Sequence, residues 1–214
     1  MKTTEQQKPI RIALTKGRLE KVTVNLFEQI GFDCTELNNK GRKLILTIPN
    51  ANIEIVLAKS ADVITYVEHG VCDIGFVGKD TIMEHGGSFF EVTDLGFGKC
   101  KFAVATQKGK EFYEGYAVKT IASKYPNVTR RHFAKKGMDV EIVKIEGSVE
   151  LAPLLNLADA IVDIVETGST LRENGLEVIE DVAPISARII VNTASIKLRK
   201  HEIEALIEKI EKSL

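Results

Sequence analysis

Hydroxyl-bearing side chains follow one apolar segment of the sequence in a pattern that suits phosphate binding. Residues 159–176 read DAIVDIVETGSTLRENGL, in which 161–165 has the composition of a buried β-strand and 166–170 is a Glu-Thr-Gly-Ser-Thr loop. Backbone N–H groups at the start of a following helix, together with Thr and Ser hydroxyls, favour an anion. Gly168 lets the backbone close around phosphate oxygens. The segment therefore predicts a phosphate cradle formed by Thr167, Gly168, Ser169 and Thr170.

Two acidic residues accompany this loop. Asp163 lies within the predicted strand and Glu166 begins the loop. Carboxylates do not bind phosphate directly, but they accept hydrogen bonds from sugar hydroxyls or hold a Mg²⁺ that bridges a pyrophosphate. Acids beside a phosphate cradle therefore indicate a phosphorylated sugar. An ordinary capped turn is the alternative, because the sequence from Thr170 to Glu173 is itself a capping box.

Basic residues follow the first predicted strand, in the sequence TKGR at positions 15–18. In doubly wound α/β folds, ligands lie beyond the carboxyl ends of the strands. Arg18 offers a fixed fork of donors and Lys16 a mobile charge, so the pair could meet a polyanion. A solvated turn explains the same residues as well or better when they are considered alone.

Three further positions carry weaker signals. Arg42 and Lys43 enter the next predicted strand, where basic residues are commonly solvent-facing. Gly78, in the sequence GFVGKD, lies between a strand and a helix, where a ligand or a neighbouring backbone could approach closely. A tight turn accounts for Gly78 equally well.

Composition limits the class of protein. The 214 residues are 44% hydrophobic, and 29 Lys and Arg nearly balance 30 Asp and Glu. No broad basic field is available for duplex nucleic acid. The start, MKTTEQQKPIRIAL, lacks the apolar run of a signal peptide, and no stretch approaches the roughly 20 apolar residues of a membrane span. These features predict a cytoplasmic protein.

Several catalytic and binding motifs are missing from the sequence. There is no Gly-x-Gly-x-x-Gly, no Gly-x-x-x-x-Gly-Lys-Ser/Thr and no Gly-x-Ser-x-Gly, so a dinucleotide fold, a P-loop and a nucleophile elbow are all disfavoured. The three cysteines have no Cys-x-x-Cys spacing, which disfavours a zinc knuckle or a disulfide framework.

Strand-like and helix-like segments alternate along the chain, which predicts an α/β protein with mainly parallel sheets. One block runs to about residue 95, a second covers about 100–180, and the chain then returns to a final helix. Two α/β lobes with a cleft between them fit this order. Ser60 and Asn127 are predicted helix caps, and a helix is expected over 148–157.

Taken together, these segments resemble the ATP phosphoribosyltransferases of histidine biosynthesis. The resemblance covers about residues 10–198. It rests on ALTKGRL (13–19), RKL (42–44), DVITYVEHGVCDIGFVGKD (62–80), GSVELAPLL (147–155) and, most specifically, on DAIVDIVETGSTLRENGL. The last segment matches that family's phosphoribosyl-pyrophosphate loop, so the resemblance assigns the loop to the 5′-phosphate and the acids to the ribose.

The resemblance implies a two-lobed, periplasmic-binding-protein-like (type II) α/β fold with the active site in the interlobe cleft. Lobe I would comprise residues 1–96 and 182–214 and carry the ATP and pyrophosphate side. Lobe II would comprise residues 97–181 and carry the phosphoribosyl-pyrophosphate loop.

The implied enzyme is a glycosyltransferase of the pentosyl type that uses Mg²⁺. ATP and 5-phosphoribosyl 1-pyrophosphate would give N1-(5-phosphoribosyl)-ATP and pyrophosphate. The catalytic cations would be Arg18, Arg42 and Lys16. The residues that bind substrate would be Asp163, Glu166, Thr167, Gly168, Ser169, Thr170, Glu150, Gly17 and Gly78.

The resemblance also implies partners. The chain ends at Leu214 directly after its last helix, as short-form members do. Such members require a regulatory chain related to histidyl-tRNA synthetase and form a hetero-octamer of four plus four, in which a homodimer of catalytic chains is expected. Two alternatives stay open: a two-lobed binding module without catalysis, and a phosphoribosyltransferase with another acceptor.

Overall fold

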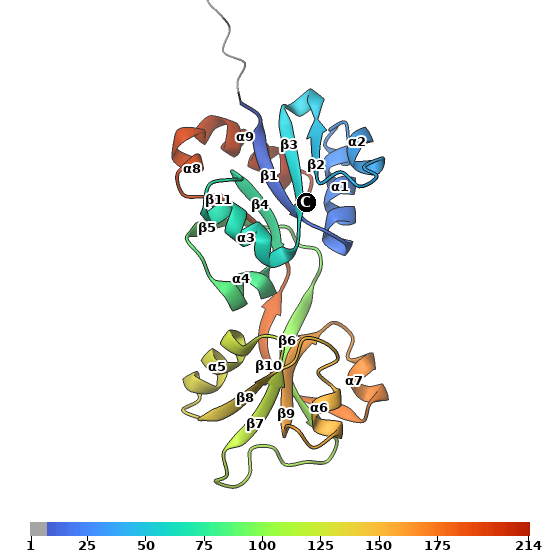
Figure 1. Ribbon diagram of the computed structural model, residues 1–214, viewed down its shortest axis with the longest axis vertical. Coiled ribbons are helices and arrows are strands. Elements are labelled where there is room, and N and C mark those ends of the chain that lie inside the picture. The colour runs from blue at the N-terminus through green and yellow to red at the C-terminus, as the bar shows by residue number, and fades with distance from the viewer. Residues whose placement is uncertain (1–7) are drawn as a thin grey trace, which may run out of the picture. The chain divides into compact units, whose positions relative to one another are not determined.

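The computed structural model describes residues 8–214 and divides into two compact units (Figure 1). One unit takes the chain up to Gly98 together with Ser186–Leu214, and the other is Lys99–Ile185. Each unit is built around one β-sheet. The prediction that the chain starts without a signal peptide concerns a segment that begins with residues 1–7, which lie outside the described part of the chain.

The first unit contains a six-stranded sheet with the strand order β2-β3-β1-β4-β11-β5. Its elements in chain order are β1 (Ile10–Thr15), α1 (Arg18–Gln29), α2 (Thr35–Asn38), β2 (Ile45–Ile48), the 3₁₀-helix η1 (Pro49–Ala51), β3 (Ile53–Ala58), α3 (Ser60–Glu68), β4 (Ile74–Gly78), α4 (Lys79–His85), β5 (Phe89–Asp94), β11 (Ala187–Asn192), α8 (Ser195–Leu198) and α9 (Lys200–Glu211).

Helices cover both faces of this sheet, as the packing of alternate side chains along β1 shows. Ile12 and Leu14 of β1 are fully buried in one apolar cluster with residues of α1 and α9. Ala13 belongs to a separate cluster with residues of α3, which Figure 1 shows in front of β1 and β4. Successive residues of a strand point to opposite faces, so α1 and α9 cover one face and α3 covers the other.

The second unit contains a five-stranded sheet with the order β10-β6-β9-β7-β8. Its elements are β6 (Cys100–Gln107), β7 (Lys119–Ser123), α5 (Pro126–Lys135), β8 (Val140–Lys144), α6 (Leu151–Leu154), β9 (Ala160–Val165), α7 (Ser169–Glu173) and β10 (Leu176–Ile185). Ile161 and Val165 of β9 pack with Ala152 of α6 and Leu171 of α7. Residues 161, 163 and 165 therefore share the face of the sheet that α6 and α7 cover.

The predicted α/β class is confirmed, but the expectation of mainly parallel sheets is wrong. β1 pairs in parallel with β3 and β4, and β7 does so with β8 and β9. The pairings β2–β3, β4–β11, β5–β11, β6–β10 and β6–β9 are antiparallel. The chain enters the second unit through β6 and leaves it through β10, so these two neighbouring strands run in opposite directions in the sheet.

Three local predictions also need correction. Ser60 is the first residue of α3 and Lys59 is its N-cap, while Asn127 is the second residue of α5 and Tyr125 is its N-cap. The helix expected over 148–157 is reduced to α6, Leu151–Leu154. The chain leaves α6 through Asn156, whose φ of 56° is left-handed and ends a helix.

None of the helices in residues 8–214 has the length and apolar character that a membrane crossing requires.

Candidate active site

A cavity of about 310 Å³ in the Lys99–Ile185 unit gathers the residues predicted to bind a phosphorylated sugar. β9 supplies the acid-bearing strand, the loop after it supplies the hydroxyls, and α7 follows the loop. The lining residues are Glu150, Asp163, Ile164, Val165, Glu166, Thr167, Gly168, Ser169, Thr170 and Leu171. Every substrate-binding residue predicted in residues 147–170 lies in this one cavity, hereafter the loop cavity.

The loop has a conformation that favours glycine. Gly168 is the N-cap of α7 and adopts a left-handed backbone with φ 70° and ψ 10°. The hydroxyl oxygens of Thr167 and Ser169 lie 3.0 Å apart, and the Arg172 guanidinium donates to the Thr167 carbonyl at 3.0 Å. The Ser169 N–H donates to the Thr167 hydroxyl at 3.3 Å, and the other amides in the first turn of α7 have no partner within the helix.

The structure overturns the alternative that residues 170–173 are simply a capping box. α7 begins at Ser169, and Gly168 is its N-cap. Thr170 is therefore the second residue of the helix and does not cap it. The run of hydroxyls needs another explanation, and its position in the loop cavity offers one.

The loop cavity contains three acids, of which Glu166 belongs to the loop after β9. Asp163 is in β9, on the face covered by α6, and Glu150 is the N-cap of α6. Burial raises the pKa of Asp163, the Ile164 N–H opposes that rise, and the Glu150 charge adds to it. The charge of Glu150 thus acts on Asp163, whose ionisation is disfavoured in its partly buried place.

Lys124 is a neighbour of these acids that the sequence reading missed. It follows β7, and β7 pairs in parallel with β9, with Ser123 opposite Val162. Its positive charge counteracts the rise in the pKa of Asp163. Its position directly after a strand could have indicated this, because parallel neighbouring strands end at the same edge of the sheet.

The predicted cations lie in the other unit, at one edge of its sheet. Lys16 follows β1, and its N–H donates to the Ala58 carbonyl at the end of β3, at 2.9 Å. β2 is antiparallel to β3, so the turn before β2, which contains Arg42, reaches the same edge. Lys16, Arg18 and Arg42 are all exposed.

The two predicted glycines at this edge have different conformations. Gly17 has φ 99° and ψ −133°, a combination that is essentially restricted to glycine. Gly78 has an ordinary extended backbone with φ −72°. A Cβ on Gly78 would meet the Asp80 carboxylate, and that side chain would have to move away.

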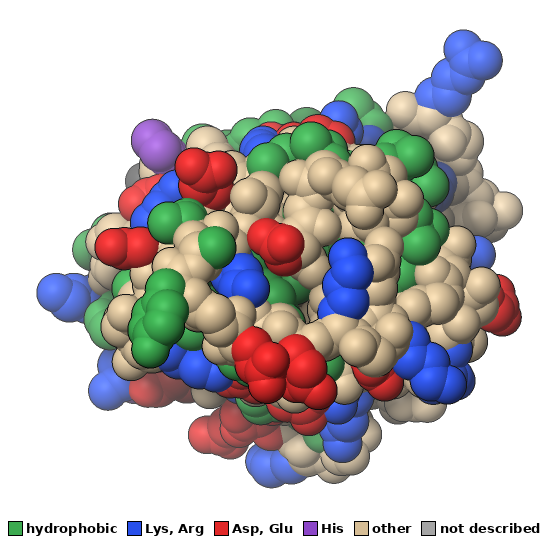
Figure 2. Space-filling view, turned by 90° about the horizontal axis from the view of Figure 1, so that it is seen from below, with side chains coloured by type: hydrophobic (Ala, Val, Ile, Leu, Met, Phe, Trp, Pro, Cys, Tyr) green, Lys and Arg blue, Asp and Glu red, His purple; other side chains and the backbone are tan. Residues whose placement is uncertain are grey.

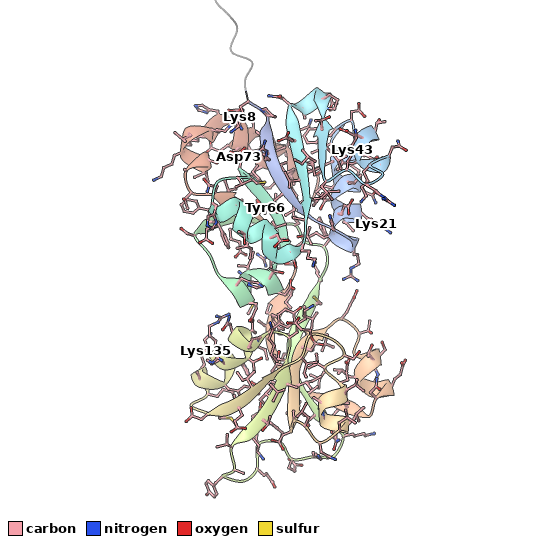
Figure 3. The ribbon with its side chains drawn as sticks, in the orientation of Figure 1. Lys8, Lys21, Lys43, Tyr66, Asp73 and Lys135 are labelled. Atoms are coloured by element: carbon pink, nitrogen blue, oxygen red, sulfur yellow. The ribbon has the colours of Figure 1, made fainter. Side chains whose placement is uncertain are left out.

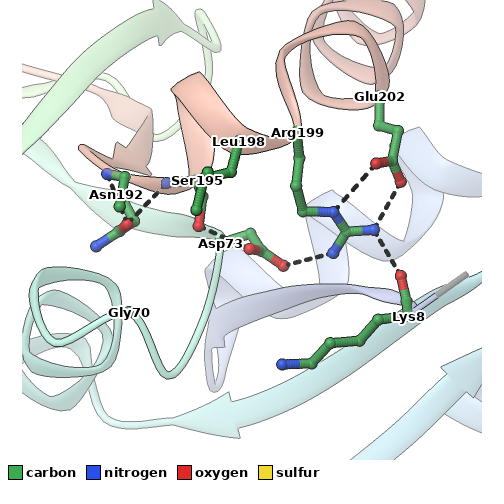
Figure 4. Close-up of a pocket in the computed structure, with 9 residues that line it drawn as sticks. Lys8, Gly70, Asp73, Asn192, Ser195, Leu198, Arg199 and Glu202 are labelled. Carbon is green, nitrogen blue, oxygen red and sulfur yellow. Dashed lines mark hydrogen bonds and ion pairs between the residues drawn. The ribbon is translucent and has the colours of Figure 1, made fainter.

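A second cavity, of about 330 Å³, lies in the first unit and has a different character (Figure 4). The Asp73 carboxylate accepts hydrogen bonds from the Ser195 hydroxyl at 2.7 Å and from Arg199 at 3.1 Å. Arg199 also binds Glu202 at 2.6 Å and the carbonyl of Lys8 at 2.6 Å. These groups satisfy one another and join the start of β4 to α8 and α9.

The two buried cysteines are poorly suited to act as nucleophiles. Burial raises the pKa of Cys34 to about 11 and that of Cys72 to about 12. Both side chains are therefore protonated at neutral pH, and a thiol is a poor nucleophile.

The surface agrees with the charge balance of the sequence. Figure 2 shows one face of the molecule, on which acidic and basic side chains are interspersed among uncharged ones. In the described residues, this face offers no continuous basic field of the kind that duplex nucleic acid would need.

Comparison with solved structures defines the class of protein. The chain superimposes on the periplasmic aliphatic sulphonate-binding protein SsuA of Escherichia coli with a TM-score of 0.60 at 12% identity, covering 96% of this chain and 72% of the other. At that identity the likeness shows the fold alone. The molecule is an α/β protein of the type II periplasmic-binding-protein-like fold, here with a glycine and hydroxyl loop after β9.

Sequence comparison then defines the family. The family model for HisG, ATP phosphoribosyltransferase, matches residues 59–212. An ATP phosphoribosyltransferase of Clostridium kluyveri is 62% identical over 96% of this chain and 94% of its own length, and one of Clostridium acetobutylicum is 60% identical over 96% of both. The chain belongs to the ATP phosphoribosyltransferase family, the pentosyltransferases of histidine biosynthesis.

A solved member of the family supports both assignments. The structure titled ATP phosphoribosyl transferase (HisG:HisZ) complex from Thermotoga maritima matches with a TM-score of 0.82 at 34% identity, over 95% of this chain and 98% of the other. The predicted fold class and enzyme family are confirmed. Membership of this family decides against the binding module and against a transferase with another acceptor.

Proposed function

We propose that this chain transfers the phosphoribosyl group of 5-phosphoribosyl 1-pyrophosphate to N1 of the adenine of ATP. The products would be N1-(5-phosphoribosyl)-ATP and pyrophosphate. The observation that carries the proposal is the loop cavity, in which partly buried acids lie beside a loop of hydroxyls and backbone amides. Phosphate and ribose need these two kinds of group side by side.

The loop would bind the 5′-phosphate. Hydroxyls of Thr167, Ser169 and Thr170 and the amides at the start of α7 can donate to phosphate oxygens. Gly168 keeps the backbone in the left-handed turn that aims these donors at one point.

The acids would bind the sugar. Asp163 and Glu166 line the cavity next to the loop, and carboxylates accept hydrogen bonds from the ribose hydroxyls. As the bond to pyrophosphate breaks, C1 of the ribose gains positive charge, as in glycoside chemistry. Glu150 would add negative charge on the same side and favour that state.

The cations of the first unit would bind the departing pyrophosphate. Arg18 and Arg42 offer planar, bidentate donors, and Lys16 adds a mobile charge. Adenine N1 itself attacks C1, so the protein supplies position and charge rather than a nucleophile. Gly17 would keep the loop between the two cations close to the ligand, and Gly78 would line the same edge of the sheet.

Mg²⁺ fits the site as an ion that arrives with the pyrophosphate. Among residues 8–214, no three His, Cys, Asp or Glu side chains form a group that could hold a metal by themselves. Mg²⁺ is commonly held by one or two carboxylates together with substrate phosphates, and Asp163 and Glu150 can supply carboxylates. The ion would neutralise charge on the leaving group.

The proposal also assigns one substrate to each unit and includes an assembly with other chains. The unit with residues 99–185 would hold phosphoribosyl pyrophosphate, and the other would hold the ATP and pyrophosphate side. The Thermotoga maritima relative is a HisG:HisZ complex. We expect this chain to assemble likewise with a regulatory chain, in a hetero-octamer of four plus four built on catalytic homodimers, in the cytoplasm where both substrates occur.

The test is a direct assay with purified chain, ATP, phosphoribosyl pyrophosphate, Mg²⁺ and pyrophosphatase. Substitution at adenine N1 changes the ultraviolet spectrum, so the product is followed by absorbance. A rise that requires both substrates supports the transfer. A flat trace both with and without the regulatory chain contradicts it.

Arg18→Ala tests the cation role within the same assay. Losing one preorganised donor should lower turnover by roughly 10²–10³-fold. Unchanged turnover would contradict the assignment of Arg18 to the pyrophosphate.

A further inference from the structure

One buried carboxylate joins the two segments that carry the proposed pyrophosphate arginines. Glu20 lies in the first turn of α1, and its side chain is 8% exposed. Its Oε2 accepts a hydrogen bond from the Gly17 N–H at 3.2 Å, and its Oε1 accepts one from Lys40 Nζ. Gly17 directly precedes Arg18. Lys40 precedes Arg42 by two residues, so both oxygens of Glu20 are used to tie these two segments together.

One of the two contacts fixes backbone, and the other joins Glu20 to a side chain of the turn that contains Arg42. Gly17 adopts its glycine-only conformation where Glu20 holds its N–H. The Lys43 N–H donates to the Lys40 carbonyl at 2.9 Å and closes the turn that contains Arg42. Lys43, labelled in Figure 3, pairs with Glu36 of α2 at 2.8 Å and anchors the far end of the turn. The backbone of Arg42 is thus held from both sides.

Helix capping explains only one of the two contacts: Glu20 binds the N–H of the N-cap residue Gly17 as in a capping box, but that contact does not require Lys40. A charge removed from water is costly unless it is paired and hydrogen-bonded, and a buried ion pair is often no more stabilising than apolar side chains of similar volume. The other buried positions of α1, at Thr23, Val24, Leu26 and Phe27, carry no charge. An apolar side chain at position 20 would pack with them but could not orient either segment.

We propose that Glu20 is a positioning residue for the transfer: it holds the Lys16–Arg18 loop and the Lys40–Lys43 turn in one arrangement so that Arg18 and Arg42 meet the same pyrophosphate. The inference rests on the pyrophosphate roles proposed for those two arginines. Glu20 acts through them and does not touch substrate. Residues that orient the groups in contact with a ligand commonly change affinity or activity by about 10–100-fold when they are removed.

The test compares two ligands that probe the two units separately. Glu20→Gln keeps an oxygen for the Gly17 N–H and removes the charge that Lys40 pairs with. Lys40→Met removes the same pair while leaving Glu20 in place, which covers the case that Glu20→Gln folds poorly. Affinities for Mg²⁺-pyrophosphate and for ribose 5-phosphate are measured by calorimetry, together with kcat and the KM for each substrate.

Glu54→Gln is the matched control. Glu54 of β3 pairs with Arg11 of β1 at the opposite edge of the same sheet, and its side chain is 22% exposed. We expect Glu20→Gln and Lys40→Met to weaken pyrophosphate binding and lower kcat by about 10–100-fold, with ribose 5-phosphate binding unchanged. Glu54→Gln should change the affinity for neither ligand, although it also removes an ion pair.

A double variant tests whether Glu20 acts through Arg42. In an Arg42→Ala background, Glu20→Gln should cost less than it does alone, because part of its effect passes through the missing side chain. Fully multiplicative losses, or a Glu20→Gln chain that behaves like Glu54→Gln, overturn the inference while the arginine roles stand. If Arg18→Ala and Arg42→Ala themselves change nothing, the proposed arginine roles fail and this inference fails with them.

Discussion

Two cavities of nearly equal size differ in how their charges are arranged. In the cavity between β4, α8 and α9, about 330 Å³, Asp73 faces Arg199 and Ser195, and Arg199 faces Glu202. In the loop cavity, about 310 Å³, Asp163 faces Glu150, and burial together with that like charge raises the pKa of Asp163. Opposite charges that satisfy one another stabilise the fold. Like charges held together disfavour the empty state and favour a site for a ligand.

This contrast explains why cavity size is a poor guide to function here. A buried charge needs a partner, and in the first unit the chain supplies it. In the loop cavity, hydroxyls, amides and acids converge where a phosphorylated sugar would complete them. Substitutions can separate the two cavities, because variants in the loop cavity should change activity and variants in the other cavity should change stability.

Gly168→Val should have the largest effect and should act on the loop cavity. The sequence alone predicts that the side chain blocks the phosphate, but a Cβ at this position would meet Arg172 at 3.2 Å and Val165 at 3.7 Å. The loss should come instead from the left-handed backbone, which a β-branched residue resists. We expect phosphoribosyl pyrophosphate binding to weaken by roughly 100-fold or more on the scale of losing several charge-assisted hydrogen bonds.

Gly168→Asn is the control, because Asn tolerates a left-handed backbone. It should retain most of the binding measured by calorimetry. Equal losses in both variants would mean that the conformation of the loop is not what matters.

Arg199→Met should act on stability and leave the chemistry intact. The substitution leaves Asp73 without its guanidinium partner in a place where the two side chains are 16% and 15% exposed. The free energy of unfolding, from urea titration, should fall by roughly 2–3 kcal/mol. Turnover at a temperature where the variant is folded should match that of the unchanged chain. A large drop in turnover there would contradict the assignment of this cavity to stability alone.

Asp163→Asn should move activity and stability in opposite directions. Losing a charged acceptor for the ribose should lower kcat/KM by roughly 10–100-fold. Folding raises the pKa of Asp163 above its ordinary 3.8, so ionisation of this group opposes folding as pH rises. The variant should therefore have the higher Tm at neutral pH, and its advantage should shrink as pH falls toward 3.8.

Asp73→Asn provides the comparison for that experiment. The same chemical change in the paired cavity removes a charge that Arg199 needs. It should lower Tm at neutral pH and leave kcat/KM unchanged. A gain of stability in both variants, or in neither, would refute the assignment of one cavity to function and the other to structure.

Ser195→Ala should have the smallest effect of the series. It removes one hydrogen bond to Asp73, at 2.7 Å, from a network that retains Arg199. The expected cost is about 1 kcal/mol in the free energy of unfolding, with no change in turnover. A larger cost in turnover than in stability would indicate that this cavity also serves catalysis.

The loop cavity could be anticipated from sequence because its residues are close together in the chain. Residues 163–170 form one strand, one loop and one helix start, and local patterning predicts such units well. Glu150 was a weaker prediction, because its meeting with Asp163 depends on α6 packing over β9. Lys124 was missed, since only the parallel pairing of β7 with β9 brings it near Asp163.

Strand direction was the main error of the sequence reading. Alternating strands and helices favour parallel sheets, but periodicity does not say which strands become neighbours. β6 and β10 pair antiparallel because the chain enters the second unit along one and leaves along the other. The helix predicted over 148–157 was also too long, since the left-handed Asn156 that follows α6 has no unique sequence signal.

The sequence by itself determined the α/β class and the family and led to the phosphate role proposed for the loop after β9, because these depend on residue types at short, fixed spacing. Tertiary structure alone decided that Glu150 would stand beside Asp163, and that Glu20 would bind both Gly17 and Lys40. Those pairs are separated in the chain by other elements. Their contact follows from how strands pair and helices cover them, which local propensity does not specify.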